Sequence, residues 1–220
     1  MHEFELINKY FSKLSNKNKS SLNLNDDVFF DKSKNLIVSV DTYNDGIHFV
    51  NFKNPELVMK KIIRSSISDL ICKGVKPKYY FISASGNRKS FSKSNLKKIS
   101  KSLKQEQKKF NISLSGGDTI LSKKLSFTIT SIGFSNKIVF RNKAKLYDDI
   151  YVTGNLGDSY AGLLVLKKNI SVNNREKKYF IDKYFLPNIQ LGLSKKLVNF
   201  ANTSIDISDG LLTDLDKLIN

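Results

Sequence analysis

Apolar residues in the first part of the chain follow two spacings, one typical of helices and one typical of strands. Helical spacing predicts an amphipathic helix over residues 4–14 and longer helices over 54–74 and 96–110. Asn54-Pro55 is a typical helix start, because Asn caps the first turn and Pro fits its first position. Runs rich in β-branched and aromatic residues predict strands at 28–30, 36–40, 78–83, 111–114 and 125–133.

A polar, basic stretch at 135–147 follows, and we interpret it as the link between two domains, 1–138 and 139–220. The second part is predicted to hold strands at 149–153 and 203–207, and helices at 161–166, 175–184, 187–200 and from 211 onward. Two strands are too few to close a sheet. We therefore expect an incomplete second domain, in a chain that is a fragment or takes its partner strands from elsewhere.

Acidic residues recur at the ends of the predicted elements. Asp41 ends the strand 36–40, and the adjacent pair Asp26-Asp27 precedes a strand, where it is either solvated or bound to a cation. Asp69 lies late in a helix, where a carboxylate opposes the helix dipole and favours a cation partner. Nearby cations in the sequence are Lys60, Lys61 and Lys73, and further acidic residues beside Gly or Ser are Asp118, Asp206 and Asp209.

Two glycine-rich stretches are candidate phosphate contacts. The run Ser-Gly-Gly-Asp-Thr at 115–119 is predicted to break the strand 111–114. Its glycines would let the backbone approach a ligand and offer amide groups to phosphate oxygens, although the same run is also common in plain turns. Gly-Asn-Leu-Gly-Asp at 154–158 resembles a phosphate-binding turn, but it lacks the spacing of a Walker loop or a dinucleotide fingerprint.

The formal charge of +17 comes mostly from lysine, since only four Arg occur among the 37 basic residues. Bidentate recognition of phosphates or bases favours Arg, and we find no basic stripe with interleaved aromatic residues. We therefore interpret the lysines as surface residues and regard nucleic-acid binding as an unfavoured alternative. A single Cys, no apolar run of membrane-spanning length and no secretory pattern at residues 1–10 predict a soluble cytoplasmic protein with no membrane partner.

Seven motifs in chain order carry a resemblance to a known family. They are Asn25-Asp26-Asp27, Ser39-Val40-Asp41-Thr42 with Asp45-Gly46-Ile47-His48-Phe49, Ser68-Asp69-Leu70 with Gly74 and Pro77, Gly116-Gly117-Asp118-Thr119, Arg141 with Ala144, the glycines and acids of 151–163, and Ile205-Asp206-Ile207-Ser208-Asp209-Gly210-Leu211. The chain resembles the thiamine-monophosphate kinases, in the superfamily named after aminoimidazole-ribonucleotide synthetase. This resemblance implies an α/β (α+β) fold of two domains. The N-terminal domain would have a mixed sheet with flanking helices, and this sheet would pair with its equal in a homodimer.

The resemblance also implies a reaction and a set of site residues. The γ-phosphate of ATP would pass to thiamine monophosphate, giving thiamine diphosphate and ADP. His48 would contact the thiamine phosphate; the alternative is a core histidine between Ile47 and Phe49. The implied Mg²⁺ ligands are Asp27, Ser39, Asp41, Asp69, Asp118, Asp206 and Asp209, and the implied ATP contacts are Gly117, Asp118, Arg141 and Ser208.

The residue types agree with this chemistry. A pocket lined by carboxylates repels ATP and a phosphate ester alike, unless several divalent cations bridge the two sets of oxygens. Mg²⁺ prefers oxygen ligands, and the chain has no Cys/His cluster for a softer metal. In-line transfer needs no covalent enzyme intermediate, so we predict no nucleophilic residue. We expect the scattered aspartates to converge in three dimensions.

The sequence departs from the family pattern in places. Asn25 stands where the family has Gly, Val40 replaces a residue that is often hydroxylated, and Tyr147-Asp148 replaces Pro-Gly. The family's later Gly-Gly-Glu-Asp-Tyr segment has no counterpart, so we expect a C-terminally truncated member. Alternatives are another ATP-dependent enzyme of the superfamily, although Gly-x-His-Phe is not expected there, and a non-catalytic basic fragment that binds nucleic acid.

Overall fold

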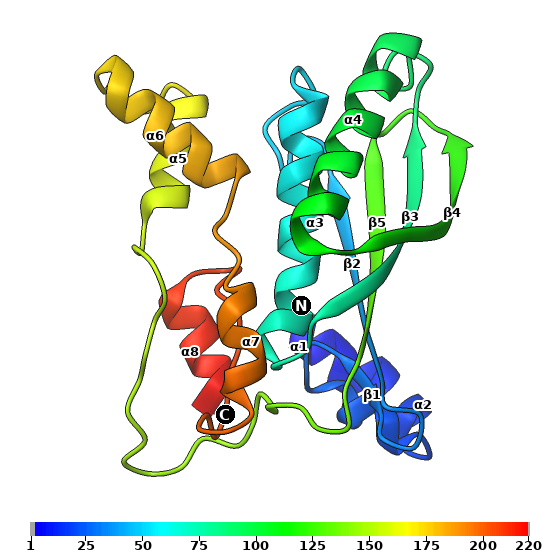
Figure 1. The fold of residues 1–220 in the computed structure, drawn as a ribbon, viewed down its shortest axis with the longest axis vertical. Coiled ribbons are helices and arrows are strands. Elements are labelled where there is room, and N and C mark those ends of the chain that lie inside the picture. The colour runs from blue at the N-terminus through cyan, green and yellow to red at the C-terminus, as the bar shows by residue number, and fades with distance from the viewer. Residues whose placement is uncertain (1–2, 220) are drawn as a thin grey trace.

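The computed structural model describes residues 3–219 of the chain (Figure 1). Its first helical segment comprises α1 (Glu3–Leu6), the π-helix η1 (Ile7–Phe11) and α2 (Ser12–Ser15), which confirms the helix predicted there. A 3-10 helix, η2 (Lys19–Leu24), follows. This N-terminal segment leads directly to Asp26 and Asp27.

A mixed five-stranded sheet forms the centre of the first part of the chain. Its strands are β1 (Phe29–Asp31), β2 (Leu36–Asn44), β3 (Pro77–Gly86), β4 (Ser113–Leu121) and β5 (Ser126–Phe134), in the order β1-β2-β5-β3-β4. The β3–β4 pair is parallel, and the other pairs are antiparallel. All five strands were expected from the sequence, and β2 continues past the expected end at Val40, so that Asp41 lies within the strand.

Two long helices, α3 (Pro55–Cys72) and α4 (Lys93–Phe110), lie over one face of the sheet (Figure 1). The α3 helix begins as predicted, because the Asn54 side chain accepts a hydrogen bond from the Leu57 N–H at 3.3 Å. Its buried Met59 and Ile62 pack in one core with Phe127 and Ile129 of β5. Burial of each such side chain contributes roughly 1.5–3 kcal/mol, so this contact fixes α3 against the sheet.

Among residues 3–219, no helix covers the opposite face of the sheet, which is partly apolar. Side chains alternate between the two faces along each strand, so residues next to buried ones point away from α3. Exposed apolar residues on this outer side of the sheet include Val40, Phe81, Ile120 and Phe134. The sheet therefore has a core face against α3 and an outer face whose apolar residues lack a covering layer within residues 3–219.

The glycines of 115–119 do not break the sheet, so the expected end of the strand at Leu114 is wrong. Strand β4 runs through Gly116 and Gly117, which pair with Phe81 and Ile82 of β3. Gly117 has a φ of +155°, and a Cβ placed there would lie 1.9 Å from the carbonyl oxygen of Ile82. Its lack of a side chain therefore lets β4 approach β3 closely, a constraint that a sequence motif does not distinguish from a turn.

The second part of the chain is helical, with α5 (Asp158–Leu166), α6 (Asn174–Phe185), α7 (Leu191–Leu197) and α8 (Leu211–Ile219). These four helices agree with the sequence. The strands expected at 149–153 and 203–207 are wrong, because both segments are irregular. A strand requires a neighbour for its backbone groups, and the side chains of Ile150 and Tyr151 are largely exposed. The domain boundary after residue 138 stays a prediction.

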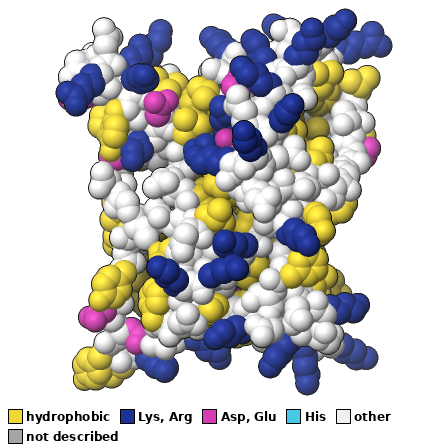
Figure 2. Space-filling model, in the orientation of Figure 1, with side chains coloured by type: hydrophobic (Ala, Val, Ile, Leu, Met, Phe, Trp, Pro, Cys, Tyr) yellow, Lys and Arg dark blue, Asp and Glu magenta, His cyan; other side chains and the backbone are white. Residues whose placement is uncertain are grey.

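The molecular surface agrees with the interpretation of the lysines as surface residues. Figure 2 shows Lys and Arg side chains spread over several parts of the visible face, without a single continuous stripe. Within residues 3–219, none of the helices is long and apolar enough to cross a membrane.

We predict that Gly117→Ala destabilises the protein by about 2–4 kcal/mol, because the new Cβ must push β4 away from the Ile82 carbonyl. The matched control is Gly192→Ala in α7, where a Cβ meets nothing within 4 Å. It should be neutral or slightly stabilising, since Ala is the better helix former. Urea unfolding measures both values, and equal stability of the two variants contradicts the close approach of β4 to β3.

Candidate active site

Four aspartates from distant parts of the sequence lie together on the α3 side of the sheet. Asp27 precedes β1, Asp41 is on β2, Asp69 is on α3 and Asp206 lies in the irregular segment before α8. Their negative charges act on one another: the charges of the other three contribute to the raised pKa of Asp69. The expected convergence is thus confirmed for these four residues, which we call the acidic cluster.

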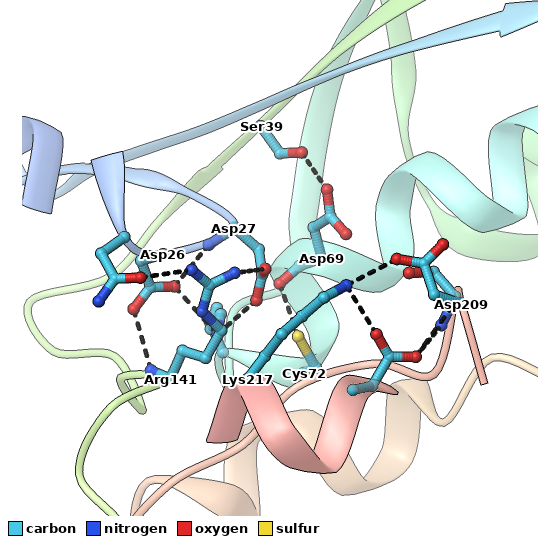
Figure 3. A network of polar contacts seen from close by, with 12 residues as sticks. Asp26, Asp27, Ser39, Asp69, Cys72, Arg141, Asp209 and Lys217 are labelled. Atoms are coloured by element: carbon cyan, nitrogen blue, oxygen red, sulfur yellow. Dashed lines mark hydrogen bonds and ion pairs between the residues drawn. The ribbon is translucent and has the colours of Figure 1, made fainter. Parts of the chain in front are cut away.

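Hydroxyl groups contact three members of the acidic cluster. The Tyr43 hydroxyl donates to Asp41 at 3.1 Å, and Ser68 donates to Asp206. Ser39 donates to Asp69, as Figure 3 shows. Ser39 and Tyr43 flank Asp41 at spacing two on β2, so strand alternation directs all three side chains to the same face. The local sequence pattern of β2 therefore builds one wall of the cluster.

The negative charges of the acidic cluster are unfavourable where they lie, as the pKa values of its carboxyl groups indicate. Burial raises the pKa of Asp41 to about 6, and the charges of Asp206 and Asp27 act in the same direction. Burial also raises the pKa of Asp69 and of Asp206, again with like charges adding to the effect. Buried carboxylates that repel one another become charged more readily when a cation lies between them. The cluster therefore has the electrostatic character of a cation site.

The donor set fits a hard divalent cation such as Mg²⁺, because carboxylate and hydroxyl oxygens are its preferred ligands. As the side chains of residues 3–219 stand, no three or more His, Cys, Asp or Glu side chains are grouped closely enough to hold a metal ion. The assignments of Asp27, Ser39, Asp41, Asp69, Asp118, Asp206 and Asp209 as Mg²⁺ ligands stay predictions.

One side of the cluster contains two basic side chains. The Lys73 ammonium lies 3.0 Å from Asp26 and 2.7 Å from Asp27, and Arg141 contacts the other oxygen of Asp27 at 2.9 Å. Burial alone would lower the pKa of Lys73, but the neighbouring negative groups, Asp27 and Asp26 among them, raise it above the ordinary value. Lys73, which the sequence offered only as a possible partner of Asp69, is therefore a charged partner of Asp26 and Asp27.

Arg141 holds the loop before β1 by three different contacts (Figure 3). Besides Asp27, its guanidinium donates to the Asn25 side chain at 2.9 Å, and its backbone N–H donates to Asp26 at 2.9 Å. Asn25, a departure from the family pattern, thus supplies an oxygen to Arg141. The prediction that Arg141 contacts ATP places that contact beside the acidic cluster, and it stays a prediction.

Asp118 lies apart from the acidic cluster within one chain. It is exposed, and its neighbour across the β3–β4 ladder is Ser83. Ser83 pairs in turn with Thr128, and Thr128 with Thr42, so these residues form one row across the outer face. The expectation that Asp118 converges with the others is therefore wrong for a single chain. The roles predicted for Gly117 and Asp118 as ATP contacts remain predictions.

Asp209 is also outside the acidic cluster, and its neighbour Asp214 was missed by the sequence analysis. Asp209 is exposed and forms an ion pair with Lys217 at 2.7 Å. Asp214 is buried, and its carboxylate accepts the backbone N–H groups of Ser208, Asp209 and Gly210. Asp214 thereby fixes the loop that carries Ser208, a predicted ATP contact. Its position in the first turn of α8, where acids are favoured, is the signal that was available in the sequence.

His48 is exposed, so the alternative of a core histidine is wrong. Its Nδ1 accepts the Asn44 N–H at 2.9 Å, and its ring lies edge-on to Tyr43 with 5.8 Å between centroids. A neutral imidazole that accepts at Nδ1 carries its proton on Nε2. The carbonyl of His48 accepts the Tyr184 hydroxyl of α6 at 3.3 Å, which connects this loop to the second part of the chain.

Comparison with known proteins gives first a class and then a family. Residues 25–135 match the family model described as "AIR synthase related protein, N-terminal domain". A thiamine-monophosphate kinase of Buchnera aphidicola (subsp. Acyrthosiphon pisum) is 37% identical, over 99% of this chain and 69% of the relative; that of Haemophilus influenzae is 32% identical, over 100% and 68%. The chain belongs to the thiamine-monophosphate kinase family.

Solved structures agree with this assignment. The structure of AaThiL complexed with AMPPCP and TMP has a TM-score of 0.87 and 28% identity, covering 98% of this chain and 69% of that one. The thiamine monophosphate kinase of Aquifex aeolicus gives a TM-score of 0.85 at 29% identity, over 99% and 73% of the two chains. The hydrogenase maturation protein HypE in complex with ATP, at 18% identity, a TM-score of 0.62 and coverage of 98% and 64%, shares the fold alone. The α/β fold expected from the resemblance is confirmed.

We predict that Asp41→Asn stabilises the folded protein by about 1–3 kcal/mol near neutral pH. The substitution keeps an acceptor for Tyr43 and removes a buried charge. The pKa of the Asp41 carboxyl is about 6 in the folded protein, against an ordinary 3.8. Its ionisation therefore lowers the free energy of unfolding fully above pH 6, and has no effect below pH 3.8, where the carboxyl is protonated in both states. The gain in unfolding free energy should therefore be full above pH 6 and disappear as the pH falls toward 3.8.

The control is Asp31→Asn, because hydrogen bonds from Ser33 lower the pKa of this exposed carboxyl. Its charged form favours the fold, so the substitution should have the opposite sign near neutral pH. Thermal unfolding in the absence of divalent cations measures both variants. A destabilised Asp41→Asn at neutral pH would show that the Asp41 charge is already neutralised within the protein.

Proposed function

We propose that this protein is a kinase that transfers the γ-phosphate of ATP to thiamine monophosphate, giving thiamine diphosphate and ADP. The observation that carries the proposal is the acidic cluster, in which Asp41, Asp69 and Asp206 are half-buried, repel one another and have raised pKa values. Membership of the thiamine-monophosphate kinase family supplies the substrate class. AaThiL, the structural relative bound to AMPPCP and TMP, supports both substrates.

The acidic cluster is the part of the protein that would hold Mg²⁺. Bound Mg²⁺ would neutralise phosphate oxygens and the charge that develops during transfer. Asp41, Asp69 and Asp206 would bind the cation, while the hydroxyls of Tyr43, Ser39 and Ser68 orient these carboxylates. The protein contributes positioning and charge, and the acceptor phosphate attacks directly without a covalent enzyme intermediate.

His48 would bind the acceptor phosphate. Its Nδ1 is engaged by the Asn44 N–H, so its exposed Nε2–H is available to donate to a phosphate oxygen. Arg141 would balance the charge of the nucleotide next to Asp27, and the loop with Ser208 is held in shape by Asp214. These roles would put the acceptor phosphate near Tyr43, which contacts Asp41, and the nucleotide near Asp27.

The active form would be a homodimer that pairs the outer faces of two sheets. The exposed apolar residues Val40, Phe81 and Ile120 on this side would be covered in such a pair. Asp118 lies on the same outer face, so it would act on the site of a second copy. Pairing across a two-fold axis brings each outer face against its equal.

We further propose a cytoplasmic location, which suits a chain whose one cysteine, Cys72, is buried and free.

The direct test is phosphorylation of thiamine monophosphate by the purified chain with ATP and Mg²⁺, followed by separation of thiamine diphosphate. Asp69→Asn should lower kcat by about 100-fold or more, because it removes charge from the centre of the acidic cluster. Asp31→Asn, an exposed aspartate outside the site, is the matched control and should retain activity. No phosphorylation by the wild-type chain, or full activity of Asp69→Asn, contradicts the proposed function.

A mixing experiment tests the homodimer. Asp69→Asn and Asp118→Asn should each be inactive alone, because each dimer then lacks one needed carboxylate at both sites. Dissociated and reassociated together at equal amounts, they should recover about a quarter of wild-type activity, since half the dimers then have one complete site of two. Recovery requires Asp118 to act on a second copy. Inactive mixtures of proven mixed dimers place Asp118 and Asp69 in the same chain's site.

A further inference from the structure

Lys73 is the most deeply enclosed basic residue next to the acidic cluster. It follows the C-terminal end of α3, and its side chain has no solvent exposure. Its ammonium lies 3.0 Å from Asp26 and 2.7 Å from Asp27, and it donates to the backbone carbonyl of Ser204 at 2.9 Å. Three oxygen atoms thus surround one buried positive charge.

The oxygen atoms around the Lys73 ammonium form a site of the kind that binds a metal cation, but here the positive charge is a side chain of the protein itself. The donors are two carboxylates and one carbonyl, all hard oxygen ligands of the kind that bind Mg²⁺ or Mn²⁺. The Lys73 ammonium lies 2.7 Å from Oδ2 of Asp27, and Arg141 donates to its Oδ1, so both oxygens already contact basic groups. A divalent cation at Asp26 and Asp27 would have to occupy the position of the Lys73 ammonium.

The other side of the cluster is different. Asp41, Asp69 and Asp206 accept hydrogen bonds from the hydroxyl groups of Tyr43, Ser39 and Ser68. A hydroxyl orients a carboxylate without cancelling its charge. The cluster therefore has one half whose carboxylates contact basic side chains of the chain, and one half whose carboxylates are oriented by hydroxyl groups.

We propose that Lys73 acts as a built-in cation that takes the place of one divalent ion, and so restricts metal binding to the half formed by Asp41, Asp69 and Asp206. Lys73 is a positioning residue in this assignment: it fixes the carboxylates of Asp26 and Asp27 and, through Ser204, the segment that leads to Asp206. The inference rests on the proposed use of divalent cations, and it adds which carboxylates bind them.

The test counts bound metal in nucleotide-free protein. Mn²⁺ is titrated into wild-type protein and Lys73→Met, and the loss of the free-ion signal in electron paramagnetic resonance gives the number of ions bound per chain. Lys73→Met keeps a side chain of similar length and removes the charge. It should bind one more Mn²⁺ than the wild type, because two buried carboxylates and a carbonyl are released to the ion. Lys76→Met, at an exposed lysine three residues on, is the matched control and should leave the number unchanged.

Thermal unfolding supplies a second readout that loss of a merely structural ion pair would not produce. Without metal, Lys73→Met should unfold about 10 °C below the wild type, because the carboxylates are left without their partner. Saturating Mn²⁺ should recover most of that loss, and it should raise the unfolding temperature of Lys76→Met only as much as that of the wild type. An equal Mn²⁺ count with no recovery in Lys73→Met overturns the proposal.

A second variant keeps the test decisive if Lys73→Met does not fold. Lys73→Met/Asp26→Asn leaves the net charge of the pair unchanged, and Asp27 retains Arg141 as its partner. The asparagine oxygen can still bind a cation, so this variant should also bind one more Mn²⁺ than the wild type, and an unchanged count overturns the proposal. Because no turnover is involved, a wild type that binds Mn²⁺ but does not phosphorylate thiamine monophosphate counts against the proposed function alone.

Discussion

Repulsion among buried carboxylates is the constraint on which the organisation of this protein depends. Asp27, Asp41, Asp69 and Asp206 meet in one place, and burial makes the charges of Asp41, Asp69 and Asp206 harder to maintain. The chain offsets this repulsion unequally, with basic side chains at Asp27 and hydroxyl groups at the other three. A site that remains unfavourable on its own is well suited to a ligand that brings cations with it, and Mg²⁺-bound ATP is such a ligand.

The fold meets this constraint through the C-terminal end of α3. Asp69 and Lys73 lie one helical turn apart there, the first directed to Ser39 of β2 and the second to Asp26, Asp27 and Ser204. Helix α3 is held against the sheet by fully buried Met59 and Ile62. Core packing in the first part of the chain therefore determines where the acidic residues from three other segments come together.

Local sequence predicted the elements that depend on local physics. The Asn54 cap of α3 and the apolar spacing of α3 and α4 were sufficient for both helices, and the strands rich in β-branched residues were found. The errors concern features that depend on distant backbone. The Gly-Gly-Asp sequence around Gly117 is compatible with both a turn and a strand. The requirement for glycine comes from the nearby carbonyl of Ile82, which is distant in the sequence. Lys73 lies four residues after Asp69, yet its charge is used by Asp26 and Asp27 across the molecule. The segments 149–153 and 203–207 have strand-like composition without a neighbouring strand to pair with.

The position of Asp118 links the proposed reaction to the proposed assembly. Within one chain the sheet separates Asp118 from Asp41, because their side chains leave β4 and β2 on opposite faces. Rotating a side chain does not change the face from which it projects, and the Gly117 backbone is held close to β3. If Asp118 serves the acidic cluster, a second copy has to supply it across the apolar outer face. If a single chain is active, Asp118 belongs to the outer face alone, and the acidic cluster performs its chemistry with Asp41, Asp69 and Asp206.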